Sequence, residues 1–248
     1  MENIILDQGY YFGMGVFETI AVEKGIPLFL QWHLERMEKG LDTLEISKER
    51  FMNKVTPEYV EEYLKRNFME HGVLKIMASE HNILFSTRKN PYVEEDYKRG
   101  FRLAMSKVIR NETSAFTYIK SFHYGDNLLE KKKIKKLGYD ETLFFNTKNQ
   151  VAEASAGNIF FVKKGKLYTP KIECGILDGI MRRYVIAHYE VEETTIKKEE
   201  IEQYEEAFLT NSLMGIMPVT SIGEKVFESR ACSAVMQKRY KVDSLKEK

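Results

Sequence analysis

Short strand-like runs joined by tight turns constrain the fold of this chain more than any other feature. Residues 15–22 are mostly apolar and end at a Glu-Lys-Gly turn. Two further pairs of runs, residues 141–146 with 150–154 and residues 158–162 with 166–169, are joined in a similar way. Runs of this length between turn residues are typical of β-hairpins. They argue against a single doubly wound parallel sheet.

Helical patterns lie between these hairpins. In residues 32–43, Leu34, Met37 and Leu41 recur at intervals of three and four, which predicts an amphipathic helix. Residues 179–190 carry a similar apolar stripe. The mixture of hairpins and helices predicts a fold of the α+β or mixed α/β class in two lobes.

A polar segment at residues 110–114, Arg-Asn-Glu-Thr-Ser, separates two stretches that differ in sequence pattern. This composition is typical of loops and linkers. We therefore expect an N-terminal α+β lobe over residues 1–110 and a C-terminal lobe over residues 111–248. The length of 248 residues allows two small domains or one large one.

Charge and cysteine content exclude several classes of protein. The chain has 38 Lys and Arg against 37 Asp and Glu, which argues against a protein whose main task is to bind nucleic acid. Only the lysine-rich run at residues 131–136 supports a nucleic-acid-binding function. Cys174, Cys232 and the five histidines show no ligand spacing, so we expect no metal site and a reduced, cytoplasmic setting. No apolar stretch reaches the roughly 18 residues of a membrane span, and we expect no membrane association.

Several short motifs become informative together, because they follow one another in a fixed order. In chain order they are Phe12-Gly13-Met14-Gly15-Val16-Phe17-Glu18-Thr19, His33-Leu34-Glu35-Arg36-Met37, Ile119-Lys120-Ser121-Phe122-His123-Tyr124, Val151-Ala152-Glu153-Ala154-Ser155-Ala156-Gly157-Asn158, Leu177-Asp178-Gly179-Ile180-Met181-Arg182 and Thr210-Asn211-Ser212-Leu213-Met214. This order resembles the fold-type IV, pyridoxal-phosphate-dependent enzymes, also called class IV aminotransferases. The resemblance runs from about Asp7 to about Pro218, nearly the whole chain, and implies a two-lobed fold-type IV architecture.

The resemblance implies pyridoxal 5′-phosphate as cofactor and assigns residues to its ring. Lys120 stands where the family has its Schiff-base lysine, at the end of an apolar stretch, where an amine loses its charge more readily. Glu153, between two alanines, matches the glutamate that keeps the pyridine nitrogen protonated. Tyr124 matches the tyrosine beside the ring hydroxyl. A surface lysine, a solvent-facing glutamate and a packed aromatic are the plain alternatives for these three residues.

Three segments are expected to bind the cofactor phosphate. Arg36 matches the arginine that binds it in the family, although a surface helix arginine is the plain alternative. Gly179 and Ile180 begin a helix, whose first N–H groups form an anion site. Ser212 and Leu213 lie in a loop that supplies further donors in relatives.

Within the family, the loop at residues 211–214 and the Gly179-Ile180-Met181-Arg182 turn most resemble the 4-amino-4-deoxychorismate lyases. That branch implies a homodimer that acts on a small molecule and forms 4-aminobenzoate and pyruvate, with Thr19 assisting the leaving group. Alternatives are an aminotransferase of D-amino acids or branched-chain amino acids, and a non-catalytic relative. The resemblance assigns no residue to the substrate carboxylates, because Glu80-His81-Asn82 replace the arginine and glycines common in relatives.

Overall fold

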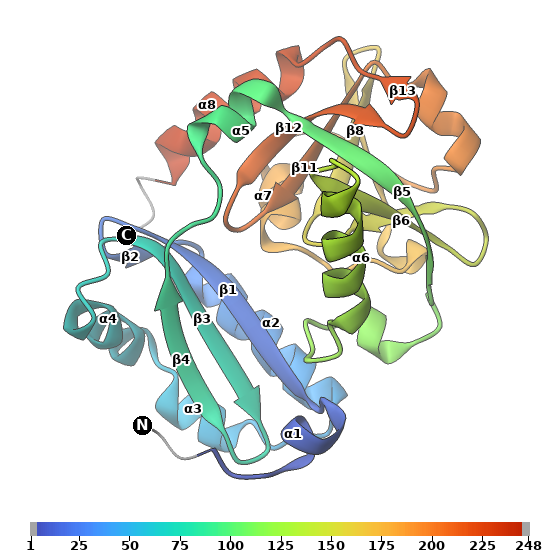
Figure 1. The fold of residues 1–248 in the computed structure, drawn as a ribbon. Coiled ribbons are helices and arrows are strands. Elements are labelled where there is room, and N and C mark those ends of the chain that lie inside the picture. The colour runs from blue at the N-terminus through green and yellow to red at the C-terminus, as the bar shows by residue number, and fades with distance from the viewer. Residues whose placement is uncertain (1–3, 245–248) are drawn as a thin grey trace. The chain divides into compact units, whose positions relative to one another are not determined.

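The protein is described here by a computed structural model that covers residues 4–244. The chain forms two compact units. Unit 1 comprises the described residues up to Pro91, the segment Ile119–His123 and Ser244, and unit 2 comprises Tyr92–Tyr118 and Tyr124–Asp243 (Figure 1). Each unit is described by itself.

Unit 1 is built on a four-stranded antiparallel sheet in the order β2-β1-β3-β4. Its strands are β1 (Gly15–Glu23), β2 (Ile26–Pro27), β3 (His71–Ser79) and β4 (Ile83–Arg88). The predicted turn after β1 is present: Lys24 and Gly25 both have positive φ, 53° and 77°, and a glycine adopts this conformation without strain.

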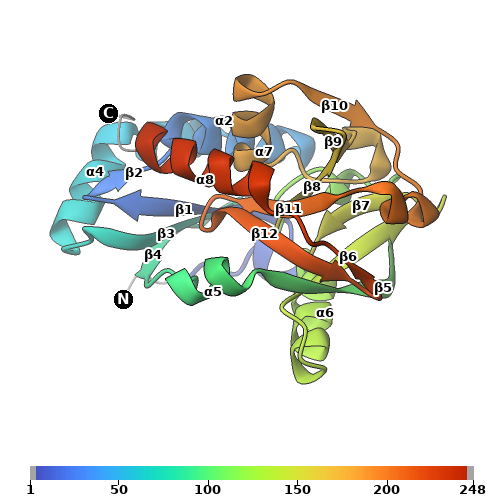
Figure 2. The same cartoon turned by 90° about the horizontal axis from the view of Figure 1, so that it is seen from above.

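Four helices complete unit 1: α1 (Gln8–Phe12), α2 (Leu30–Thr43), α3 (Glu49–Lys54) and α4 (Pro57–Arg66). The predicted stripe of Leu34, Met37 and Leu41 is buried on α2. Figure 2 shows α2 and α4 on one side of this sheet. The helices therefore cover one face, onto which β1 directs Ile20 and β3 directs Ile76, both fully buried.

Unit 2 holds a nine-stranded mixed sheet in the order β10-β9-β8-β11-β12-β5-β6-β7, with β13 paired to β12. Its strands are β5 (Phe101–Arg110), β6 (Glu141–Asn146), β7 (Val151–Ala154), β8 (Asn158–Lys163), β9 (Lys166–Pro170), β10 (Val191–Thr194), β11 (Glu206–Asn211), β12 (Gly215–Ile222) and β13 (Lys225–Val226). The helices of this unit are α5 (Glu94–Arg99), α6 (Gly125–Lys136), α7 (Ile180–His188) and α8 (Ala231–Asp243).

Unit 2 contains a large apolar core cluster. Fully buried members include Leu103, Leu143, Ile159, Phe161 and Leu209. Strands β6, β7 and β8 are buried along nearly their whole length, because both of their faces are covered.

The predicted mixed α/β class and the predicted hairpins are confirmed, whereas the linker at residues 110–114 is placed differently. By compactness the chain first passes between the units after Pro91, because β5 pairs with β6 and β12 inside unit 2. The segment Ile119–His123, expected in the C-terminal lobe, returns to unit 1. Among residues 4–244 no helix is long and apolar enough to cross a membrane.

Candidate active site

The segment Ile119–His123 is held against the start of β1. The Phe17 N–H donates to the Lys120 carbonyl at 2.8 Å, and the Phe122 N–H donates to the Gly15 carbonyl at 2.9 Å. Gly15 permits this approach, because a Cβ there would lie 2.4 Å from the Phe122 ring. The backbone at Lys120 is therefore fixed by hydrogen bonds on both sides.

The amine of Lys120 lies over an aromatic ring. Its Nζ is 4.5 Å from the centroid of Phe17, within range of a cation–π interaction. Side chains alternate along a strand, so Thr19 projects from β1 to the same face as Phe17. Unit 1 thus brings together the amine and the hydroxyl that the sequence predicts as catalytic groups.

On the opposite face of β1, Arg36 is bound to a buried carboxylate that we did not predict. Glu18 is fully buried and accepts hydrogen bonds from Arg36 Nε at 2.6 Å and Nη2 at 2.8 Å. His33 Nδ1, also fully buried, lies 2.7 Å from Glu18 Oε2. The sequence did carry a signal, since Glu18 alternates with the apolar residues Val16 and Ile20 and must share their buried face.

Electrostatics keeps this cluster in one charge state. Burial raises the pKa of Glu18, but Arg36 and His33 outweigh it and hold that pKa well below its ordinary value. Burial lowers the pKa of His33, although Glu18 opposes the shift. The cluster is thus an ionised carboxylate between a charged arginine and a neutral imidazole, and it fixes the orientation of Arg36.

In unit 2 the predicted Glu153 is also buried and held by a cation. The residue is 8% exposed, and its Oε1 lies 3.3 Å from Arg110 Nη2. Oε2 accepts a hydrogen bond from the Leu177 N–H at 3.0 Å. Arg110 itself stacks over the Phe144 ring, with Cζ 4.0 Å from the centroid. The residue expected to begin a linker therefore ends β5 and positions the predicted cofactor acid.

Tyr124 belongs to the same cluster as Glu153. Its hydroxyl donates to the Ser155 carbonyl at 2.6 Å, and Asn127 Nδ2 donates to that carbonyl as well. Asn127 Oδ1 accepts from Arg110 Nη1 at 3.0 Å. Burial, and next the charge of Glu153, raise the pKa of Tyr124 well above its ordinary value, so the hydroxyl stays protonated.

The predicted anion site lies at the N-terminus of α7. Gly179 is the N-cap residue, and no side chain in the described part of the chain caps the helix there. The carboxylate of Asp178, the residue before Gly179, pairs with Arg183 at 2.7 Å. A Cβ on Gly179 would lie 2.0 Å from Asn158 Oδ1, so glycine is required. The first turn of α7, which includes Ile180, therefore has no capping side chain on its N–H groups among the described residues.

The loop after β11 is fixed by one side chain. Asn211 Oδ1 accepts from the N–H groups of Leu213 at 2.9 Å and Met214 at 2.8 Å, and Asn211 Nδ2 donates to the Ala156 carbonyl. The Leu213 N–H expected to bind phosphate is thus bonded within the loop. The neighbouring Thr210 Oγ1 is buried and unpartnered within residues 4–244.

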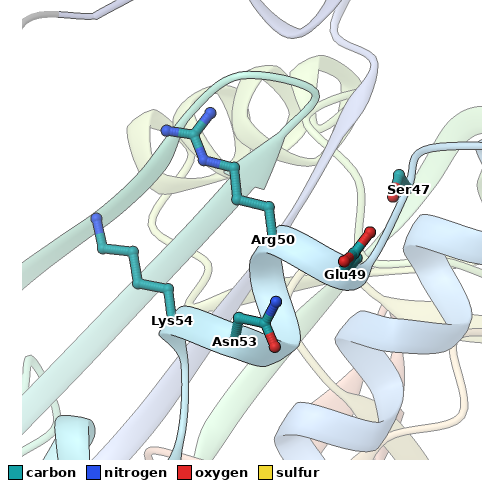
Figure 3. Close-up of a pocket in the computed structure, with 5 residues that line it drawn as sticks. All are labelled: Ser47, Glu49, Arg50, Asn53 and Lys54. Atoms are coloured by element: carbon teal, nitrogen blue, oxygen red, sulfur yellow. The ribbon is translucent and has the colours of Figure 1, made fainter.

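A surface pocket of unit 1 shares no residue with these clusters. It is lined by Ser47, Glu49, Arg50, Asn53 and Lys54. Figure 3 shows Arg50 and Lys54 extending from α3 in the same direction. Both are used structurally: Arg50 donates to the His81 carbonyl at 2.7 Å, and Lys54 donates to the Ile83 carbonyl at 3.4 Å. These bonds fasten α3 to the β3–β4 hairpin.

The lysines of the run at residues 131–136 are partly paired. Lys131 lies 3.1 Å from Glu141, and Lys133 lies 3.2 Å from Glu130. The run is therefore not a uniformly unpaired basic surface, which weakens the argument for a nucleic-acid-binding helix.

Comparison with known proteins identifies the family. The model of the family described as amino-transferase class IV matches residues 15–222. Aminodeoxychorismate lyase of Bacillus subtilis is 29% identical over 95% of this chain and 87% of its own length. A probable branched-chain-amino-acid aminotransferase of Thermotoga maritima is 30% identical over 86% of this chain and 78% of its own length. The crystal structure of a putative 4-amino-4-deoxychorismate lyase from Legionella pneumophila has a TM-score of 0.87 at 28% identity, covering 98% of this chain and 96% of that one.

The chain belongs to the class IV aminotransferase family, whose members are enzymes that depend on pyridoxal 5′-phosphate. Each unit, taken by itself, carries residues that fit that cofactor. Unit 1 supplies an amine over an aromatic ring and an oriented arginine, and unit 2 supplies a carboxylate held by Arg110, a helix N-terminus without a capping side chain and an unpartnered buried hydroxyl.

Proposed function

We propose that this protein is a lyase that converts 4-amino-4-deoxychorismate into 4-aminobenzoate and pyruvate. One observation carries the proposal: the amine of Lys120 and the hydroxyl-bearing Thr19 share one face of the unit 1 sheet, beside Phe17. An elimination needs a base for the proton and a donor for the leaving group, and these two side chains supply them. Relatives named as lyases support the choice of substrate.

In this proposal the cofactor supplies an electron sink for the carbon that bears the substrate amine. Lys120 would hold the cofactor through its amine, and the same Nζ would take the proton from that carbon of the substrate. The bond between the ring and the enolpyruvyl oxygen then breaks, and the electron pair leaves with the oxygen. Thr19 hydrogen-bonds the departing oxygen, and the enol becomes pyruvate by gaining a proton at its CH₂ carbon.

The other predicted site residues are assigned to the ring of the cofactor or to its phosphate. Glu153, which is held by Arg110, would accept a hydrogen bond from the protonated pyridine nitrogen, and Tyr124, whose pKa is raised, would donate to the ring hydroxyl. Arg36, Gly179, Ile180 and Ser212 would hold the phosphate. Leu213 contributes through the Asn211 turn rather than through its N–H. The proposal includes a homodimer in the cytoplasm, and the two free cysteines agree with a reduced setting.

A second candidate is an aminotransferase of branched-chain or D-amino acids. Relatives with these names align with most of the chain, one of them at 30% identity. An aminotransferase returns the substrate proton to the cofactor and needs a keto acid to complete its cycle, whereas a lyase needs no second substrate.

The deciding experiment is product release from 4-amino-4-deoxychorismate in the absence of any keto acid. We expect 4-aminobenzoate and pyruvate in equal amounts over many turnovers. If the compound yields nothing, while D-alanine or leucine converts the bound cofactor fully to its amine form, the protein is the aminotransferase.

Covalent attachment has its own test. Borohydride reduction of the holoenzyme should fix the cofactor to the peptide that contains Lys120, as read by mass spectrometry. Lys120→Ala should fold normally, because its side chain adds little to the core, and its turnover should fall by at least about a thousandfold. Label on another lysine would refute the assignment.

A further inference from the structure

Asn127 lies in the first turn of α6, and its amide is hydrogen-bonded to two groups outside that helix. The residue is 7% exposed. Its Oδ1 accepts a hydrogen bond from Arg110 Nη1 at 3.0 Å, and its Nδ2 donates to the Ser155 carbonyl at 2.6 Å. Asparagine is a poor helix former unless its side chain caps the helix. These contacts therefore account for the asparagine at this position better than helix propensity does.

Arg110 depends on Asn127 for its orientation. Its guanidinium lies over Phe144, with Cζ 4.0 Å from the ring centroid, and this contact does not fix where the N–H groups point. Among residues 4–244, Arg110 Nε has no hydrogen-bond partner, while Nη1 is bound to Asn127 and Nη2 lies 3.3 Å from Glu153 Oε1. Because the two Nη atoms belong to one planar group, the bond to Asn127 fixes the direction of the nitrogen that faces Glu153.

The carbonyl that Asn127 binds is itself held in place. Ser155 Oγ donates to Glu141 Oε1, which also accepts from the Thr142 N–H at 2.9 Å. Glu141 Oε2 pairs with Lys131 at 3.1 Å. Ser155 is 1% exposed, and a buried carbonyl needs donors from the protein.

Tyr124 is the second donor to this carbonyl, at 2.6 Å. A phenol has one proton, so Tyr124 cannot donate it to the Ser155 carbonyl and to the cofactor ring at the same time. A buried carbonyl that loses its donor is unfavourable. Because Asn127 remains bound to that carbonyl, the Tyr124 proton can turn to the cofactor without this penalty.

We propose that Asn127 is a positioning residue of the cofactor site, which directs Arg110 toward Glu153 and releases the Tyr124 hydroxyl to donate to the cofactor. The inference rests on the proposed assignment of Glu153 and Tyr124 to the cofactor ring, and it is the same for a lyase and for an aminotransferase. An amide is required because one bond needs a donor and the other an acceptor. Leucine offers neither group, and aspartate offers only the acceptor.

The test is the visible absorption of the cofactor in the holoenzyme, titrated with pH in the absence of substrate. Donation by Tyr124 stabilises the deprotonated form of the ring hydroxyl, so Tyr124→Phe should move the midpoint of this titration. We expect Asn127→Leu and Asn127→Asp to move it in the same direction by about half a pH unit or more, the weight of one net hydrogen bond. Combined with Tyr124→Phe, either variant should give less than the sum of the single shifts, because both substitutions act through the same hydroxyl. Asn127→Asp keeps the shape of the side chain, so the test stands even where Asn127→Leu does not fold.

Ser106→Ala is the matched control. Ser106 Oγ donates to the buried Glu130 at 2.7 Å and so joins the same strand, β5, to the same helix, α6, through residues outside the Asn127 cluster. Ser106→Ala and the Asn127 variants should each lower the thermal midpoint of the cofactor-free protein by a few degrees, because each loses a buried hydrogen bond. Only the Asn127 variants should shift the titration of the cofactor.

Four results would overturn the proposal: a wild-type titration in the Asn127 variants, an equal shift in Ser106→Ala, full additivity with Tyr124→Phe, or a wild-type titration in Tyr124→Phe itself. Product release from 4-amino-4-deoxychorismate by the wild-type protein is assayed in parallel. The titration requires no substrate, so an inactive protein with the Asn127-dependent shift rejects the lyase function alone. An active lyase without that shift rejects the role of Asn127 alone.

Discussion

Each unit of the molecule holds a buried glutamate against an arginine, and the two pairs differ in how much of the carboxylate the protein uses. Glu18 of unit 1 is fully buried, and both of its oxygens are bound by charged or imidazole groups. Glu153 of unit 2 lies farther from its arginine, at 3.3 Å from Arg110. It accepts a hydrogen bond from the Leu177 N–H and is 8% exposed. Glu18 therefore serves the framework of unit 1, whereas Glu153 is the carboxylate that we propose for the cofactor ring.

The largest expected difference between the two glutamates is in the free energy of unfolding. Glu18→Gln leaves Arg36 buried opposite a neutral group, and breaking a buried pair in this way costs about 3–5 kcal/mol. Chemical unfolding of the cofactor-free protein should show that loss. The matched control is Glu23→Gln on the same strand, whose exposed pair with His71 is worth at most about 1 kcal/mol. Equal effects of the two substitutions would remove the distinction.

Glu153→Gln should act on catalysis more than on stability. The amide keeps the size of the side chain but cannot hold the pyridine nitrogen protonated, so we expect turnover to fall about a hundredfold while the cofactor still binds. Steady-state rates together with cofactor titration measure both quantities. Wild-type turnover in the variant would mean that another acid serves the ring.

Arg36→Ala removes the cation that Glu18 orients. A charge-assisted contact is worth about 1.5–3 kcal/mol, so cofactor affinity should weaken by about tenfold or more. The release of cofactor on dilution provides the measurement, and Arg50→Ala, in the pocket of Figure 3, is the control. Unaltered affinity in Arg36→Ala would make the arginine purely structural.

The smallest effect concerns pH. Because the pKa of His33 is lower in the folded protein than its ordinary value of 6.5, the unfolded chain takes up a proton first as the pH falls. The free energy of unfolding should therefore decrease as the pH falls below 6.5, by up to about 1.4 kcal/mol per pH unit. Unfolding free energies between pH 7.5 and about 5 should show this slope, and His33→Gln should lack it. A slope that persists in the variant would assign the effect to other groups.

The sequence by itself determined the class of the fold, most of the strands and helices, and the family. Hairpin turns, strand alternation and the helical stripe on α2 are local properties, and they act over a few residues whatever the rest of the chain does. The ordered motifs predicted Lys120, Glu153 and Arg36 as site residues, and all three lie within residues 15–222, which the family model matches.

Only the tertiary structure decided which side chains meet. The bond between Asn127 and Arg110, the contact of Arg110 with Glu153 and the return of Ile119–His123 to unit 1 join residues far apart in the chain. Their partners are fixed by strand register and by burial, and a one-residue change of register would move Arg110 or Glu153 to the other face of its strand. For that reason Asn127 was one more polar residue in a helix until the fold placed it between Arg110 and the Ser155 carbonyl.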